Sequence, residues 1–172
     1  MSETVTEHDG GDVIVRVDIA GTLVFMVTAI IAAVLFTGTA QWVGAVTAIA
    51  LFFVGIGAFL WSFWNAVQRS RSEQVAVTQL YLLGGGVAPA PVRRIMLVLL
   101  AAQVVTGLGT ALARTDAADG SPGTSLALGV LVPVFGLGMN GLWAAYHGTY
   151  RSRTDTVGTT ATASIDKNED HG

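Results

Sequence analysis

The stretch Phe53–Glu73, FVGIGAFLWSFWNAVQRSRSE, decides the fold. It is an apolar run that ends in two tryptophans and then in a pair of arginines, Arg69 and Arg71. Membrane helices end in this way at the inner surface, because aromatic rings prefer the headgroup level and cytoplasmic loops carry an excess of positive residues. The stretch therefore indicates a membrane helix that runs into a basic cytoplasmic loop.

A second stretch, Phe135–Asp155, repeats the same features in the same order (FGLGMNGLWAAYHGTYRSRTD). In both stretches a G-x-G precedes Leu-Trp, then an aromatic and a polar residue, then Arg-Ser-Arg. Convergence is one explanation, since interfaces favour Trp and inner ends favour Arg. The ordered match favours an internal duplication, which predicts two helical hairpins related by an axis along the membrane normal.

The composition is that of an integral membrane protein. Of the 172 residues, 52% are hydrophobic and 12% charged, against about 25% charged in soluble domains. Long segments carry no charge at all; they lie between Asp18 and Arg69, Arg94 and Arg114, and Asp119 and Arg151. Because about 20 helical residues cross about 30 Å of hydrocarbon, such segments predict membrane spans.

The sequence therefore predicts an all-α membrane protein, with four transmembrane helices packed as two repeated hairpins in a pseudo-twofold bundle. The membrane domain covers 16–153, with spans at about 19–36, 42–67, 95–113 and 124–148. Pro133 lies inside the fourth span, where a missing hydrogen bond predicts a helix kink. The acidic residues 1–15 and the low-complexity residues 154–172 are predicted to be disordered tails.

The longest connection, 68–94, contains an apolar segment that is too short to cross the membrane, SEQVAVTQLYLL (Ser72–Leu83). Three glycines, Gly84–Gly86, and two prolines follow it and break regular structure. We expect a short interfacial helix with an exposed apolar side, followed by a glycine hinge. A re-entrant dip is the alternative, and it requires protein to shield the backbone from lipid.

Arginines in the loops set the predicted orientation. Six of them mark the inner face as topology anchors: Arg69, Arg71, Arg93, Arg94, Arg151 and Arg153. The opposite side has Arg114 alone. The positive-inside rule therefore places both termini and the long loop in the cytoplasm, with the protein in the cytoplasmic membrane.

Two amides, Gln103 and Asn140, are the candidate intramembrane polar pair. They lie roughly 13–17 Å from the nearest inner arginines along their helices, near the middle of the bilayer. They are expected to bond each other or the carbonyl freed by Pro133 as structural glue; alternatively they line a small polar site. Asp18 is expected at the inner edge of the first span, paired with Arg16, which leaves no acid or base in mid-membrane.

Other chemistry finds little support in the sequence. The chain has no Cys, and its three His residues form no cluster with other ligand types, so no metal site, catalytic residue or cofactor is predicted. Phosphate-binding, dinucleotide-binding and hydrolase motifs are absent from the sequence. Nucleic-acid binding is not expected.

Small-xxx-small pairs (Ala29/Ala33, Gly44/Ala48, Gly107/Ala111, Gly141/Ala145, Ala144/Gly148) indicate packing within the chain, or alternatively a dimerisation face.

Two segments, LVPVFGLGMNGLWAAYHG (Leu131–Gly148) and SRSEQVAVTQLYLLGGGVAP (Ser70–Pro89), give a resemblance to a family. They resemble small, uncharacterised actinobacterial four-helix membrane proteins, a family that implies no activity or site residue. The residues favour a non-enzymatic accessory or scaffold subunit, which binds lipid and either a membrane protein partner or a second copy of itself. A channel or facilitator for a small neutral solute is the alternative.

Overall fold

The computed structural model describes residues 4–71, 73–116 and 124–151, with side chains from Gly10 onward. Over these residues the fold is helical. Its elements are α1 (Thr4–Leu35), α2 (Gly38–Arg69), α3 (Val77–Tyr81), α4 (Ala90–Ala113), the 3-10 helix η1 (Ser125–Leu131) and α5 (Pro133–His147).

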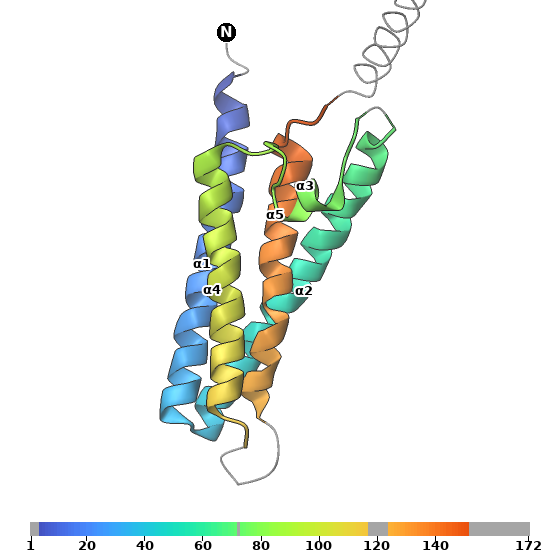
Figure 1. Cartoon of the computed structure of the whole chain (residues 1–172). Helices are drawn as coiled ribbons and strands as arrows, with labels where there is room; N and C mark the ends of the chain where they lie inside the picture. The colour runs from blue at the N-terminus through green and yellow to red at the C-terminus, as the bar shows by residue number, and fades with distance from the viewer. Residues whose placement is uncertain (1–3, 72, 117–123, 152–172) are drawn as a thin grey trace, which may run out of the picture.

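Four stretches are long and apolar enough to cross a membrane: Gly10–Leu35, Gly38–Arg69, Ala90–Ala113 and Ser125–His147. This confirms the predicted all-α fold with four helices able to span a membrane, and it supports a multi-pass membrane protein. The start of α1, the end of α2, the start of α4 and the end of α5 lie at one end of the bundle, which we call the arginine-rich end (Figure 1).

Helix α1 begins much earlier than predicted, so the expected disordered tail over 1–15 is wrong from Thr4 onward. Its first turns pack on the end of α5 through two glycines. A Cβ atom on Gly11 would lie 3.3 Å from Nε1 of Trp143, and one on Gly10 would lie 3.4 Å from the ring of His147. The missing side chains let the two helices approach each other. The predicted tail over 154–172 lies outside the described residues.

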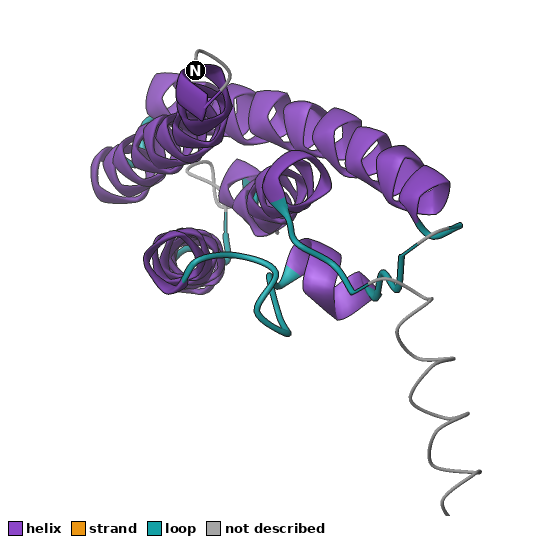
Figure 2. Cartoon of the chain, turned by 90° about the horizontal axis from the view of Figure 1, so that it is seen from above, coloured by secondary structure: helices purple, strands orange, loops and turns teal. Residues whose placement is uncertain are grey.

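Helix α5 is the centre of the bundle. It packs along α2 and also contacts α1, α3 and α4, which surround it in Figure 2. Half of the most apolar part of its span is buried, against 28%, 22% and 17% for the other three spans in chain order. The outer helices therefore present most of their residues to the surroundings of the bundle, as lipid-facing helices do.

Glycines set the crossing of α2 and α5. A Cβ atom on Gly55 would lie 2.5 Å from the backbone of Phe135, and one on Gly138 would lie 2.5 Å from the carbonyl oxygen of Gly55. The two backbones thus touch at a point where no larger residue fits. Gly57, the other glycine of the first G-x-G, faces open space.

Pro133 begins α5 rather than bending a continuous α-helix. The chain runs through η1, which has 3-10 geometry, and the α-helix starts at Pro133. A proline is favourable at this first position, because its missing N–H would have no partner inside the helix. The Gly129 carbonyl, which a helical residue at 133 would have bonded, instead accepts from the N–H of Val132 at 3.2 Å. The predicted kink is therefore a junction between two kinds of helix.

Residues 73–89, which we call the re-entrant segment, leave the end of α2, place α3 beside α5, and return to the start of α4 (Figure 1). The Tyr81 hydroxyl donates to the carbonyl oxygen of Phe59 at 3.3 Å, and the two rings stack at 4.2 Å. Phe59 precedes Arg69 by ten residues, which is about 15 Å along a helix. The segment therefore dips well into the bundle.

The expected short helix is present as α3, and Val77 and Leu82 keep an exposed apolar side. The rest of the segment packs on α2 and α5, as the re-entrant alternative requires, while its depth in a membrane stays a prediction. The apolar side chains of the segment are mostly covered by the chain itself; Leu80, Tyr81, Leu83, Val87 and Ala88 are buried. Gly85 and Gly86 adopt positive φ angles of 66° and 81°, which favour glycine. The predicted glycine hinge is therefore the place where the chain turns back toward the arginine-rich end.

Candidate functional site

Gln103 is fully buried and joins three helices. Its Nε2 donates to Thr22 Oγ1 at 2.7 Å and lies 3.3 Å from Asp18 Oδ1, both on α1. Its Oε1 accepts the N–H of Gly136 on α5 at 3.1 Å. We call these side chains, with the Gly136 N–H, the Asp18 cluster. It is the candidate site of the protein.

Asp18 is fully buried, and its Oδ2 has no hydrogen-bond partner among the described residues. The expected pairing with Arg16 is wrong: Arg16 is exposed, and Asp18 faces Gln103. The reason is the packing of α1: Asp18 lies on the helix face that is buried against α4 and α5, whereas Arg16 points away from it. Helix α1 therefore contains a buried acid that the sequence analysis had placed at the inner edge of the span.

Local sequence spacing explains how these groups meet. On α1 the buried positions are Asp18, Thr22, Phe25, Ala29 and Ala32, which recur every three or four residues and so lie on one helix face. Gly136 places the α5 backbone directly against the Gln103 side chain. A Cβ atom there would lie 2.6 Å from Gln103 Oε1, so a larger residue would not fit. Its N–H is among the first four of α5, which lack partners inside the helix, and Gln103 satisfies it.

Asn140, the second predicted amide, is also fully buried but has different partners. Its Nδ2 donates to the Tyr81 carbonyl oxygen at 2.9 Å, and its Oδ1 has no partner in the described part of the chain. Gln103 and Asn140 therefore do not bond each other, nor the Gly129 carbonyl above Pro133. Asn140 instead satisfies a carbonyl that the re-entrant segment carries into the bundle, where water cannot do so.

Arg69 closes the end of α5. Its Nη1 donates to the Ala145 carbonyl oxygen at 2.9 Å and its Nη2 to that of Gly148 at 3.4 Å, while its Nε bonds Glu73 at 3.0 Å. The last carbonyls of a helix lack partners and carry partial negative charge, so a guanidinium stabilises them. Its Cζ also lies 5.0 Å from the ring centre of Tyr150. Burial raises the pKa of the Tyr150 phenol, and the Arg69 charge opposes this shift.

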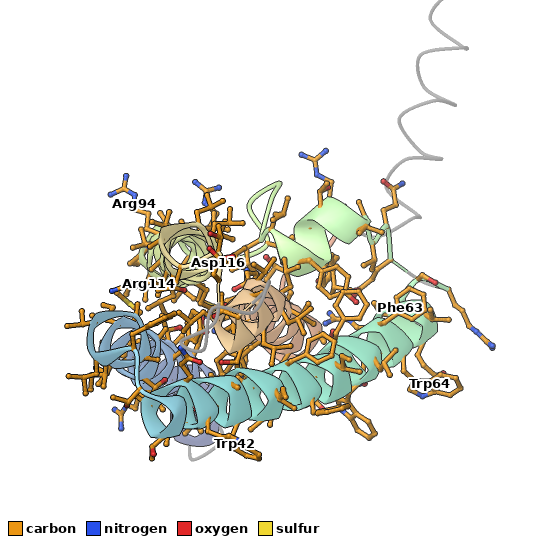
Figure 3. The ribbon with its side chains drawn as sticks, turned by 90° about the horizontal axis from the view of Figure 1, so that it is seen from below. Trp42, Phe63, Trp64, Arg94, Arg114 and Asp116 are labelled. Carbon is orange, nitrogen blue, oxygen red and sulfur yellow. The ribbon has the colours of Figure 1, made fainter. Side chains whose placement is uncertain are left out.

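The other predicted anchors lie at the same end of the bundle with fewer contacts. Arg71, Arg94 and Arg151 are exposed, Arg93 is half-buried, and Arg153 lies outside the described residues. Figure 3 shows Arg94 projecting away from α4, and Trp42 and Trp64 projecting from the outer side of α2. This arrangement suits residues at a membrane surface, while the side of the membrane on which they lie stays a prediction.

The predicted small-xxx-small pairs are used inside the bundle. All ten residues of these pairs are buried or half-buried within the chain. Gly107 is one example: a Cβ atom there would lie 2.5 Å from the Gly129 carbonyl oxygen of η1. The pairs therefore support packing within the chain rather than an exposed dimerisation face.

A cavity of about 650 Å³ opens at the arginine-rich end. Its lining comes from α1, the re-entrant segment, α4 and α5, and includes Asp12, Pro89, Val92, Trp143 and His147. The cavity could not be predicted from the sequence, because part of its lining comes from the first turns of α1, which were expected to be disordered.

The described residues contain no group of three His, Cys, Asp or Glu that could hold a metal ion. No family model matches the chain, and neither the curated proteins nor the solved structures give a match. The resemblance to actinobacterial membrane proteins therefore stays a prediction.

Proposed function

We propose that this chain is a non-enzymatic multi-pass protein of the cytoplasmic membrane that serves as an accessory or scaffold subunit for a membrane protein partner. The observation that carries this proposal is the use of both intramembrane amides within the bundle. Gln103 ties α1 to α4 and α5, and Asn140 ties α5 to the re-entrant segment. Buried amides that hydrogen-bond between elements of the same chain make the bundle a rigid unit.

The partner would contact the outer side of the bundle, since most apolar side chains of the re-entrant segment pack on the chain itself. Helix α4 is the best placed, because its buried residues form one narrow stripe, Met96, Gln103, Gly107 and Thr110. On its other side Val105 and Leu112 are 70% and 76% exposed. A Cβ atom on Gly109 would meet nothing within 4 Å, so a partner helix could approach closely there.

Affinity purification from native membranes in mild detergent tests this proposal, with a photo-cross-linking residue placed at Leu112. We expect a cross-link to one defined membrane polypeptide. The matched control places the same residue at Thr110, which is buried in the bundle and should cross-link only within the chain. Recovery of this chain alone, as a monomer with no cross-linked product, would refute the proposal.

A facilitator for a small neutral solute is the second candidate, and the buried polar cluster around Gln103 is the observation in its favour. Asn140 lies apart from that cluster and bonds the Tyr81 carbonyl on α3. The two amides therefore share no hydrogen-bonded network that could form one path for a solute. Flux into proteoliposomes across a panel of small neutral solutes tests this candidate, and background flux for all of them would eliminate it.

The duplication is also proposed rather than established. It is supported by the sequence match and by the contacts between the two hairpins, in which α1 packs against α4 and α2 against α5. Superposition of α1–α2 on α4–α5 in an experimental structure tests it. Hairpins that differ in helix order or crossing direction would contradict it.

A further inference from the structure

We propose that Asp18 is a proton-binding site within the membrane, at which Oδ2 takes up and releases a proton. This goes beyond the accessory role, because it gives the bundle a charge that can change. In the uptake step an oxygen lone pair of the carboxylate binds a proton delivered through water, and the release step returns it. No other bond forms or breaks.

The ionised form has no charge partner. An isolated carboxylate away from water is costly in hydrocarbon and is usually paired. The other charged or titratable side chains described on the helices of the cluster are Asp12 and Arg16 on α1, Arg93 and Arg94 on α4, and Tyr146 and His147 on α5. The Asp18 carboxyl is instead hydrogen-bonded to Gln103 and Thr22, so no positively charged side chain pairs with it among the described residues.

The protonated form is also incompletely satisfied. Oδ1 faces the Gln103 amide, so the proton would sit on Oδ2, which has no acceptor. Buried polar groups in native proteins nearly always have a partner. Oδ2 lacks a hydrogen-bond partner whether the carboxyl is ionised or protonated. It is therefore the atom at which a proton can bind and leave without breaking another hydrogen bond.

A proton suits this place better than a metal ion. Calcium takes six to eight oxygen ligands, and magnesium takes an octahedral set. Here one carboxylate oxygen is free, while the Gln103 oxygen is held by the Gly136 N–H and Thr22 Oγ1 accepts from the Gln103 amide. The cluster offers too few oxygens for a metal.

The cavity at the arginine-rich end supplies the route. It is lined by Asp12 of α1, Val92 of α4 and His147 of α5, which are the three helices that also build the Asp18 cluster. Asp18 follows Asp12 by six residues, or about 9 Å along the helix. Protons would therefore reach Asp18 from this end, through the cavity beside His147.

The test uses the full-length chain in liposomes and a membrane-soluble carbodiimide, which adds to protonated carboxyl groups. Samples are labelled at a series of pH values, and the modified residue is identified by peptide mass spectrometry. We expect labelling at Asp18 that falls at least tenfold as the pH rises, and no label at that position in Asp18→Asn. Labelling of Asp18 that is the same at every pH would overturn the proposal.

Infrared difference spectroscopy provides a second measurement that does not require reagent access. The wild-type protein should gain a protonated carboxyl band on acidification that Asp18→Asn lacks, with circular dichroism confirming that the variant is folded. Asparagine retains an oxygen that can accept from Gln103, so the fold should persist. The proposal is overturned if this band does not change with pH. Val92→Trp, which fills the cavity, should slow the band's response to a pH jump; an unchanged rate would contradict the route.

Discussion

At the scale of single residues, Asn140 connects α5 to the re-entrant segment through the Tyr81 carbonyl. Replacing it with leucine removes the donor and leaves that carbonyl buried without a partner. We expect Asn140→Leu to lower the free energy of unfolding by about 1–3 kcal/mol, measured by thermal unfolding in detergent. Asn65→Leu is the matched control, because the Asn65 amide bonds only the Trp61 carbonyl of its own helix. Equal melting of the two variants would contradict this role.

Residue-level prediction from the sequence succeeded for burial and failed for partners. Gln103 and Asn140 were identified because an amide inside a charge-free span needs a bonding partner. The partners themselves, Asp18 and the Tyr81 carbonyl, lie 85 and 59 residues away in the chain. Such contacts depend on how far α1 extends and where the chain between α2 and α4 folds back, and helix periodicity carries no information on either.

At the scale of elements, the approach of α2 to α5 depends on one glycine of the first G-x-G and not on the other. A methyl group at Gly55 would press on the Phe135 backbone at 2.5 Å, whereas one at Gly57 would meet nothing within 4 Å. Backbone atoms cannot yield as a flexible side chain would, so the helices would have to separate.

We therefore expect Gly55→Ala to destabilise the fold by about 1–3 kcal/mol, the cost typical of overpacking. Gly57→Ala should be neutral or slightly stabilising, because alanine has the higher helix propensity by about 1 kcal/mol. Unfolding of both variants in the same detergent provides the comparison. A loss of stability of the same size in both would show that this crossing does not depend on close backbone contact.

The end of α5 provides a second test at this scale. Arg69→Ala removes two hydrogen bonds to the last carbonyls of α5 and the ion pair with Glu73. Because the side chain is one-third exposed, we expect a loss of about 1–2 kcal/mol, with faster amide hydrogen exchange in the last turn of α5. Arg71→Ala removes an exposed arginine from the same loop and should leave that turn unchanged.

Element boundaries were predictable where charge or aromatic residues mark them and not elsewhere. The second span was expected at 42–67 and its helix covers Gly38–Arg69, since tryptophans and arginines mark its ends. At the first span Asp18 was taken as the edge, whereas the helix itself begins at Thr4. In the fourth span the 3-10 geometry of η1 leaves no clear signal in its sequence, SLALGVL.

For the whole molecule, the orientation in the membrane follows from charge, and its prediction can be tested directly. The arginine-rich end holds the described anchors, while Arg114 lies at the opposite end, where it bonds the Ala33 carbonyl oxygen at 3.3 Å. Arg114 thus caps a carbonyl near the end of α1. As a single arginine, it does not offset the larger number of arginines at the other end. The positive-inside rule then places the arginine-rich end in the cytoplasm.

The natural absence of cysteine allows single-cysteine variants without any background. Gln68 at the arginine-rich end and Thr115 at the opposite end are both exposed. In intact cells a membrane-impermeant maleimide should label Thr115→Cys and leave Gln68→Cys unlabelled until the membrane is opened. The reverse pattern would invert the topology and would open the cavity near Asp12 and His147 to the outside. Protons would then reach Asp18 from the external medium, because that cavity lies at the arginine-rich end whichever way the bundle is inserted.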